Sequence, residues 1–119
     1  MGVKEEKKQK QEGGAMGEWK IAEEKIIPMS GKQVEKFLKG LRKWKAFTNR
    51  VSELDGGIRE FPLFERSFNL GMLEVKEKGK LMDVVVKKQQ KRGRVKYHVE
   101  RATLYMVKLE RVELRVYPE

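Results

Sequence analysis

A helix is the clearest element in the pattern of apolar and polar positions. Apolar residues recur every three or four positions from Val34 to Leu54, which is the spacing of one helix face. Ser30 and Gln33 stand where the two residues of a capping box would begin this helix. The repeat ends at Asp55-Gly56-Gly57, where glycine can supply the left-handed residue that closes a helix. The pattern therefore predicts one long helix.

Shorter apolar runs on both sides of this helix predict strands. A first strand is expected over residues 18–27, with Pro28 at its end. Phe61, Phe64 and Phe68 recur at spacings of three and four, which predicts a short helical turn starting at Pro62. A meander is expected to follow, with strands over 72–76, 81–88 and 94–100 and turns over 77–80 and 87–96.

The last part of the chain changes its alternation. Odd positions from Tyr97 to Leu109 are mostly apolar, whereas Val112, Leu114 and Val116 are even. One extra residue moves every following side chain to the other face, so a bulge is expected at residues 110–111. The expected fold is α+β, with an antiparallel sheet of five to six strands, mostly a meander, packed against one long helix and a short helical turn.

Two regions of the chain differ in composition. Residues 1–17 have no apolar periodicity and contain three glycines near their end, which predicts a flexible charged tail. Residues 18–119 are expected to form a single α+β domain, large enough for a modest core. Lys and Glu are abundant while Asn and Asp are scarce, a bias typical of proteins from hyperthermophiles.

Positive charge is concentrated in two segments. The chain has 28 Lys and Arg against 18 Asp and Glu, and its pI is about 9.8. Residues 87–96, KKQQKRGRVK, lie between two predicted strands and contain six basic residues and no acidic one, namely Lys87, Lys88, Lys91, Arg92, Arg94 and Lys96. Such a loop repels itself, and a polyanion relieves the repulsion. The alternative is a solvated tip that keeps the protein soluble.

The predicted helix carries the second basic segment. At about 100° per residue, five cations lie opposite the apolar stripe, namely Lys32, Lys36, Lys39, Lys43 and Arg50. Glu35 is the only acidic residue between positions 32 and 50. An ordinary solvated helix face explains this pattern equally well.

Aromatic residues interleave with the basic segments. Phe47 is expected to lie off the apolar stripe of the helix, and Tyr97 adjoins the basic tip. Single-stranded nucleic acids stack their bases on aromatic rings beside basic grooves, so both are candidate stacking residues. Phe37, Phe61, Phe64 and Phe68 are better explained as core residues. An odd position on its strand also permits burial of Tyr97.

Little in the sequence favours catalysis or a cofactor. The chain has one histidine, His98, and no cysteine, so neither a Cys-His dyad nor a thiolate or His-rich metal site is expected. No glycine-rich phosphate loop follows a predicted strand. We therefore expect no metal, no cofactor and no enzymatic activity.

One enzyme class stays open through a resemblance. The order of strand, helix and basic meander over residues 18–117 resembles that of RelE-type messenger-cleaving toxins. In that family two helices usually precede the meander, whereas this sequence predicts one. The resemblance implies metal-independent cleavage of RNA by basic residues and tyrosines, with Tyr97 and His98 as the residues to test.

The sequence favours a cytoplasmic nucleic-acid-binding protein that neutralises phosphates and stacks bases. Its expected partner is RNA or single-stranded DNA, with a ribonucleoprotein such as the ribosome as one setting and a homodimer left open. No apolar stretch approaches the roughly 20 residues that span a bilayer, which weakens a membrane partner. Two alternatives remain, the RelE-like endoribonuclease and a protein-interaction module that pairs through the terminal strand 112–117.

Overall fold

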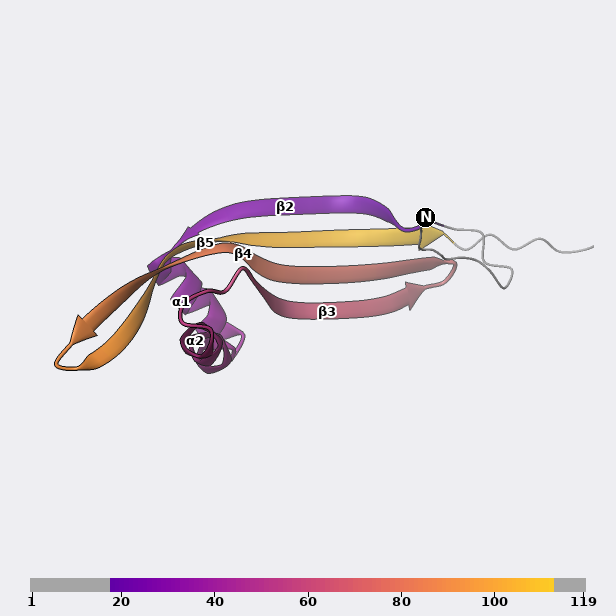
Figure 1. Cartoon of the computed structure of the whole chain (residues 1–119). Helices are drawn as coiled ribbons and strands as arrows, with labels where there is room; N and C mark the ends of the chain where they lie inside the picture. Colours follow the sequence, from indigo (N-terminus) through magenta and orange to yellow (C-terminus); the bar gives the residue numbers. More distant parts are fainter. Residues whose placement is uncertain (1–17, 113–119) are drawn as a thin grey trace, which may run out of the picture.

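The computed structural model describes residues 18–112, which fold as an α+β domain with two helices and a four-stranded antiparallel sheet. The elements follow in the order β2 (Lys20–Ser30), α1 (Gly31–Gly40), α2 (Trp44–Glu53), β3 (Glu60–Leu70), β4 (Leu73–Lys91) and β5 (Arg94–Val112). Both helices lie on the same side of the sheet, near the point where β4 and β5 bend (Figure 1).

The two longest strands form the axis of the molecule. β4 and β5 have 19 residues each and occupy the centre of the sheet, whose strand order is β2-β5-β4-β3. β2 stops pairing with β5 at Arg101, and β3 stops pairing with β4 at Met82. Residues 84–99 therefore form a two-stranded arm that extends beyond the four-stranded part (Figure 1).

The core lies between the helices and the middle of the sheet. Val34, Leu38, Phe47 and Val51 project from α1 and α2, and each is at most 3% exposed. They pack against sheet residues that include Phe61, Leu63, Leu81, Ala102 and Leu104. We call this side of the sheet the helix face. The alternating positions form the open face, which no helix among residues 18–112 covers.

The prediction of a single long helix is wrong. α1 ends at Gly40, and Arg42 adopts a left-handed φ of 58°. The amide of Lys43 donates to the carbonyl of Leu38, and the amide of Arg42 donates to that of Lys39. These are the two bonds of a Schellman motif, so the chain turns here although its apolar repeat continues.

The predicted ends of the helical region are confirmed. The side chain of Ser30 accepts from the amide of Gln33, and the Gln33 side chain accepts from the amide of Ser30 at 2.8 Å. α2 closes with a second Schellman motif, in which the amide of Gly56 donates to Val51. The left-handed residue at its C′ position is Asp55, with φ of 52°, rather than a glycine.

The predicted helical turn after Pro62 is also wrong, because this segment belongs to strand β3. Phe61 faces Leu81 and Phe64 faces Gly79 across the β3–β4 ladder, with an irregularity between Pro62 and Phe64. The extra residue brings both rings to the helix face although they are three residues apart. The bulge thus explains why the phenylalanines of this strand have a spacing that is typical of a helix.

The meander has fewer strands than predicted. Residues 77–80 do not form a turn. They belong to β4 and pair with β3 on one side and with β5 on the other. The Phe64 ring lies over Gly79, since a Cβ atom there would come within 2.7 Å of the ring. Gly79 therefore does not form a turn. Its missing side chain leaves space for the Phe64 ring.

The change of alternation lies elsewhere than expected. The ladder from Leu73↔Val112 to Met82↔Thr103 is unbroken, so no bulge occurs at residues 110–111. Irregularities instead fall between Met82 and Val86, where Asp83 has a φ of 51°. Val112 pairs with Leu73 at the end of β5, which is a central strand, and the edge strands are β2 and β3. The predicted tail 1–17 and residues 113–117 of the predicted terminal strand lie outside the described residues.

Candidate nucleic-acid interface

The basic segment 87–96 forms the tip of the arm, as the flanking apolar runs predict. β4 ends at Lys91 and β5 begins at Arg94, leaving a two-residue turn of Arg92 and Gly93. Both turn residues have positive φ, 52° and 76° respectively. This combination is that of a type I′ turn, whose twist matches the flanking strands. The turn places Lys91 and Arg94 directly opposite one another.

The two faces of the arm differ in chemistry. On its inner face, Val84, Val86, Tyr97 and Val99 pack against the core. Gly56, after α2, lies so close that an added Cβ atom would come within 2.9 Å of Val86 and 3.2 Å of Tyr97. The outer face consists of three cross-strand pairs, namely Lys87↔His98, Gln89↔Lys96 and Lys91↔Arg94. Four of the six predicted tip cations therefore share one exposed face.

The other two tip cations lie elsewhere. Lys88 pairs with Tyr97 on the inner face, and its Nζ lies 4.0 Å from a carboxylate oxygen of Asp55. Arg92 occupies the turn itself and is exposed. The structure thus divides the predicted tip into a cationic outer face, a turn cation and a cation close to an acid.

Tyr97 serves to attach the arm to α2. Its ring is half-buried against the core, and its hydroxyl donates a hydrogen bond to Asp55. This bond raises the pKa of Tyr97 above 10.0, with further increases from desolvation and from the negative charge of Asp55. Tyr97 therefore lies on the inner face of the arm, on the other side from the three cationic cross-strand pairs.

The prediction for Phe47 is wrong in its premise. The Phe47 side chain is 0% exposed, so it does not lie off the apolar stripe. It packs edge-to-face on Phe61 and is stacked with Trp44, at centroid distances of 5.2 and 5.9 Å. The break at Arg42 separates the stripe of α2 from that of α1, which places Phe47 one turn before Val51 in the core.

The predicted row of helix cations is split by the same break. Lys32, Lys36 and Lys39 lie on α1, Lys43 is the N-cap residue of α2, and Arg50 lies in its last turn. Lys39 forms an ion pair with Glu35 at 2.7 Å. The outer arm face alternates with residues that contact the helices, so it points away from them. The two predicted groups of cations do not form one surface.

Sequence reasoning missed a row of lysines on the open face. Lys76, Lys78 and Lys80 alternate along β4 and pair with Leu109, Val107 and Tyr105 of β5. Their spacing of two was the available signal, but the turn predicted over residues 77–80 concealed it. Beside this row a hollow of about 350 Å³ opens, with Pro62, Tyr105 and Val107 among its lining residues.

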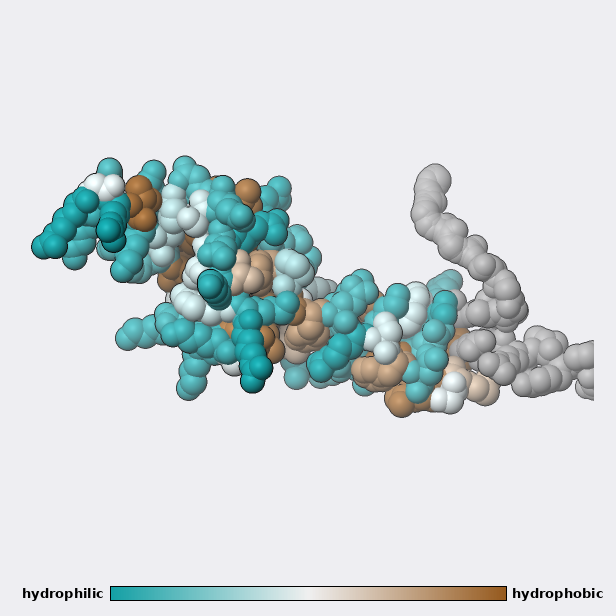
Figure 2. All heavy atoms as spheres, turned by 90° about the horizontal axis from the view of Figure 1, so that it is seen from below, coloured by the Kyte–Doolittle hydropathy of each residue, from teal (hydrophilic) through white to brown (hydrophobic). Residues whose placement is uncertain are grey.

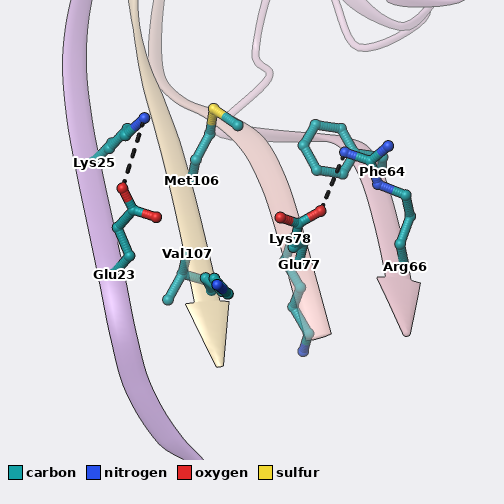
Figure 3. Close-up of a pocket in the computed structure, with 9 residues that line it drawn as sticks. Glu23, Lys25, Phe64, Arg66, Glu77, Lys78, Met106 and Val107 are labelled. Atoms are coloured by element: carbon teal, nitrogen blue, oxygen red, sulfur yellow. Dashed lines mark ion pairs between the residues drawn. The ribbon is translucent and has the colours of Figure 1, made fainter. Parts of the chain in front are cut away.

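On the part of the helix face that the helices do not cover, cations lie close to acidic residues. A smaller hollow of about 110 Å³ is lined there by Phe64, Met106 and several charged residues (Figure 3). Lys25 lies 3.8 Å from Glu23, and Arg66 lies 3.4 Å from Glu77 (Figure 3). Seen from the helix side, hydrophilic residues cover the arm tip and much of the helices, with smaller apolar patches between them (Figure 2).

Metal and membrane features were also sought within residues 18–112. No group of three or more His, Asp or Glu side chains in this range is arranged to hold a metal ion. Neither helix of the described part is long and apolar enough to cross a membrane. Comparisons with family models, with curated proteins and with solved structures found no match.

Proposed function

We propose that this protein binds nucleic acid, either RNA or single-stranded DNA, through the outer face of the arm. The observation that carries the proposal is the arrangement of Lys87, Lys91, Arg94 and Lys96 on one exposed face of a two-stranded ribbon. Residues 84–99 contain six basic residues and no acidic one. A row of phosphates is the natural counterpart of such a face.

The pair Lys91↔Arg94 favours this function over a merely solvated tip. Like charges directly opposite one another destabilise a strand pair. An acidic residue at either position would remove the repulsion and keep the tip hydrophilic. The repulsion also disappears when a phosphate lies between the two cations. The arrangement therefore suits a bound polyanion better than it suits the free protein.

The RelE-like alternative gains one feature and loses another. Two helices precede the meander here, as is usual in that family. Tyr97 and His98, however, are neighbours on one strand, so their side chains lie on opposite faces of the arm. Tyr97 donates to Asp55 on the inner face, and His98 is 2.9 Å from Gln89 on the outer face. The two do not converge on one phosphate, and we propose binding without cleavage.

A salt titration tests the proposal. Binding is measured with matched single- and double-stranded RNA and DNA oligonucleotides at several salt concentrations. If four to six cations contact phosphates, the log–log slope is roughly −3 to −5. Binding that does not depend on salt, or no binding at low salt, contradicts the proposal. Metal-independent RNA cleavage that is lost in His98→Ala would favour the RelE-like alternative instead.

A further inference from the structure

The open face of the sheet continues the cationic outer face of the arm along β4. Lys76, Lys78 and Lys80 point to the open face, since the residues between them pair on the helix face. Lys87 and Lys91 belong to the outer arm face, opposite the inner residues that contact the core. Five lysines of one strand therefore lie on the same side of the molecule.

The irregularity at Asp83 makes this continuity possible. Lys80 and Lys87 are seven residues apart, and an odd separation puts two side chains on opposite faces of a regular strand. The register shifts between Met82 and Val86 change the alternation, so that both lysines face away from the helices. The bulge thus joins the basic positions of the sheet and of the arm into one path.

Apolar side chains of β5 accompany this path. Leu109, Val107 and Tyr105 are the cross-strand neighbours of Lys76, Lys78 and Lys80 and are all half-buried. Successive lysines are about 6.6 Å apart, since each residue of a strand advances about 3.3 Å. Acidic residues flank the lysines on the β3 side, since Glu65 stands opposite Lys78 and the Lys80 Nζ lies 3.2 Å from a carboxylate oxygen of Glu60. On the β5 side, the row of ammonium groups next to a row of apolar groups suits a ligand with a charged backbone and flat apolar substituents.

Tyr105 is an aromatic residue of the open face that borders a hollow. Its hydroxyl donates to Glu24 at 2.7 Å, and the Lys80 Nζ lies 5.8 Å from its ring centroid. The ring borders the hollow of about 350 Å³, whose lining includes Lys78 and Lys80 and also the acidic Glu65. Trp19 has two cations close to its ring, Lys76 at 4.4 Å and Arg111 at 5.0 Å, whereas Lys80 lies farther from the ring of Tyr105.

We propose that the open face binds an extended single strand of nucleic acid, with its phosphates along the lysines of β4 and one unstacked base on Tyr105. The inference rests on the proposed function and specifies its ligand. A base can reach a ring in a hollow only when it is free of its stack and its partner strand. A duplex presents phosphates alone, so it can engage the arm but not Tyr105.

The test compares Tyr105→Leu with Tyr105→Phe. Affinities are measured for 12-nucleotide single strands of RNA and DNA and for the matched duplexes, at two salt concentrations. Loss of one stacked base is expected to weaken single-strand binding by about 5- to 150-fold in Tyr105→Leu. Tyr105→Phe keeps the ring and should stay within about twofold of the wild type, and neither substitution should change the salt slope. Comparison of the RNA and DNA oligonucleotides shows which sugar is preferred.

Two further measurements separate a loss of stacking from a loss of folding and from general attraction to polyanions. Lys78→Gln leaves Tyr105 in place and should reduce the salt slope for single strands by about 0.7, the value for one phosphate contact. Equal binding of single strands and duplexes, or a folded Tyr105→Leu that binds like the wild type, overturns the inference. So does binding of polyglutamate as tight as that of the single strands. If the wild type binds no oligonucleotide at all, the proposed function itself fails.

Discussion

The two ends of the β4–β5 ribbon differ in whether their cations lie close to acidic residues. At the four-stranded end, Arg66 lies 3.4 Å from Glu77, Lys108 lies 3.5 Å from Glu110, and Arg111 is paired with Glu74. In the arm, Lys91 lies opposite Arg94, and no acidic residue occurs between positions 84 and 99. The four-stranded end therefore contains several close ion pairs, whereas the outer face of the arm carries cations with no acidic residue among them.

The difference separates charges that stabilise the fold from charges that leave it strained. Of these ion pairs, Arg111–Glu74 is part-buried and the more exposed ones contribute little each, but all of them offset repulsion between like charges. The arm lacks neighbouring strands, so its inner face must hold it in place through Val86, Tyr97 and their contacts with the end of α2. Repulsion between its outer cations weakens the strand pair instead of stabilising it.

Neutralising the arm should have the largest effect. In Lys91→Gln/Arg94→Gln/Lys96→Gln, three phosphate contacts are lost, so the log–log salt slope should become less steep by about 2 to 3 units. If the salt-independent part of binding is unchanged, the affinity at 0.1 M salt falls about 100- to 1,000-fold by the same relation. Filter binding or fluorescence anisotropy measures both quantities.

The matched control removes as much charge from the other end. Lys25→Gln/Arg66→Gln/Lys108→Gln changes three cations that have acidic neighbours within 4 Å. We expect its slope to stay within about one unit of the wild type, since these cations lie on the helix face. Equal losses in the two triple variants would mean that net charge, and not the arm, governs binding.

The attachment of the arm can be disturbed at Gly31. A Cβ atom there would lie 1.9 Å from the carbonyl oxygen of Val99, a backbone atom at the base of the arm. Gly31→Ala should therefore force α1 and β5 apart, at a cost of about 1–3 kcal/mol. Gly40→Ala is the control, because no atom lies within 4 Å of its added Cβ. Gly40→Ala should stabilise the fold by about 0.4–1 kcal/mol. Urea unfolding of both variants measures these changes in the free energy of unfolding.

Local signals in the sequence predicted the ends of elements better than their interiors. The capping box at Ser30 and the tip around Gly93 depend on a few neighbouring residues, and both occur where predicted. The break at Arg42 was not foreseeable, because an arginine in the left-handed region leaves the apolar repeat intact. The irregularities near Pro62 and Asp83 shift the alternation without a glycine to mark them.

The same bulges explain what the sequence hid of the candidate site. A bulged strand made Phe61 and Phe64 look helical, and a glycine under the Phe64 ring made residues 77–80 look like a turn. The assumed turn divided β4, so Lys78 and Lys80 were not recognised as part of one row with Lys87. Segregation of charge could be predicted, but the face that carries it depends on register, which is a property of the whole sheet.

Alkaline pH should loosen the arm through Tyr97. Because Asp55 raises the pKa of Tyr97 above 10.0, the bond between them stabilises the fold fully below pH 10.0 and is lost as pH rises through the raised pKa. The melting temperature of the wild type should exceed that of Tyr97→Phe below pH 10.0, and the difference should shrink as the pH rises through the raised pKa of Tyr97. Tyr105 also has a raised pKa, owing first to its hydrogen bond with Glu24, and its titration affects both melting temperatures alike because both proteins contain it. A difference that does not depend on pH would place the effect in packing instead.

The smallest expected effects differ in sign between the two ends. Arg66 is 62% exposed and its partner Glu77 is 36% exposed, so Arg66→Gln should destabilise the fold by only a few tenths of a kcal/mol. Arg94→Gln removes a cation that lies opposite Lys91, and it should stabilise the fold by a similarly small amount. Both changes should be largest at low salt and disappear at 1 M salt, where the Debye length is about 3 Å. Urea unfolding at both salt concentrations measures them. If Arg94→Gln is destabilising at low salt, the arm cations already have compensating contacts in the free protein, and the contrast between the two ends is not electrostatic.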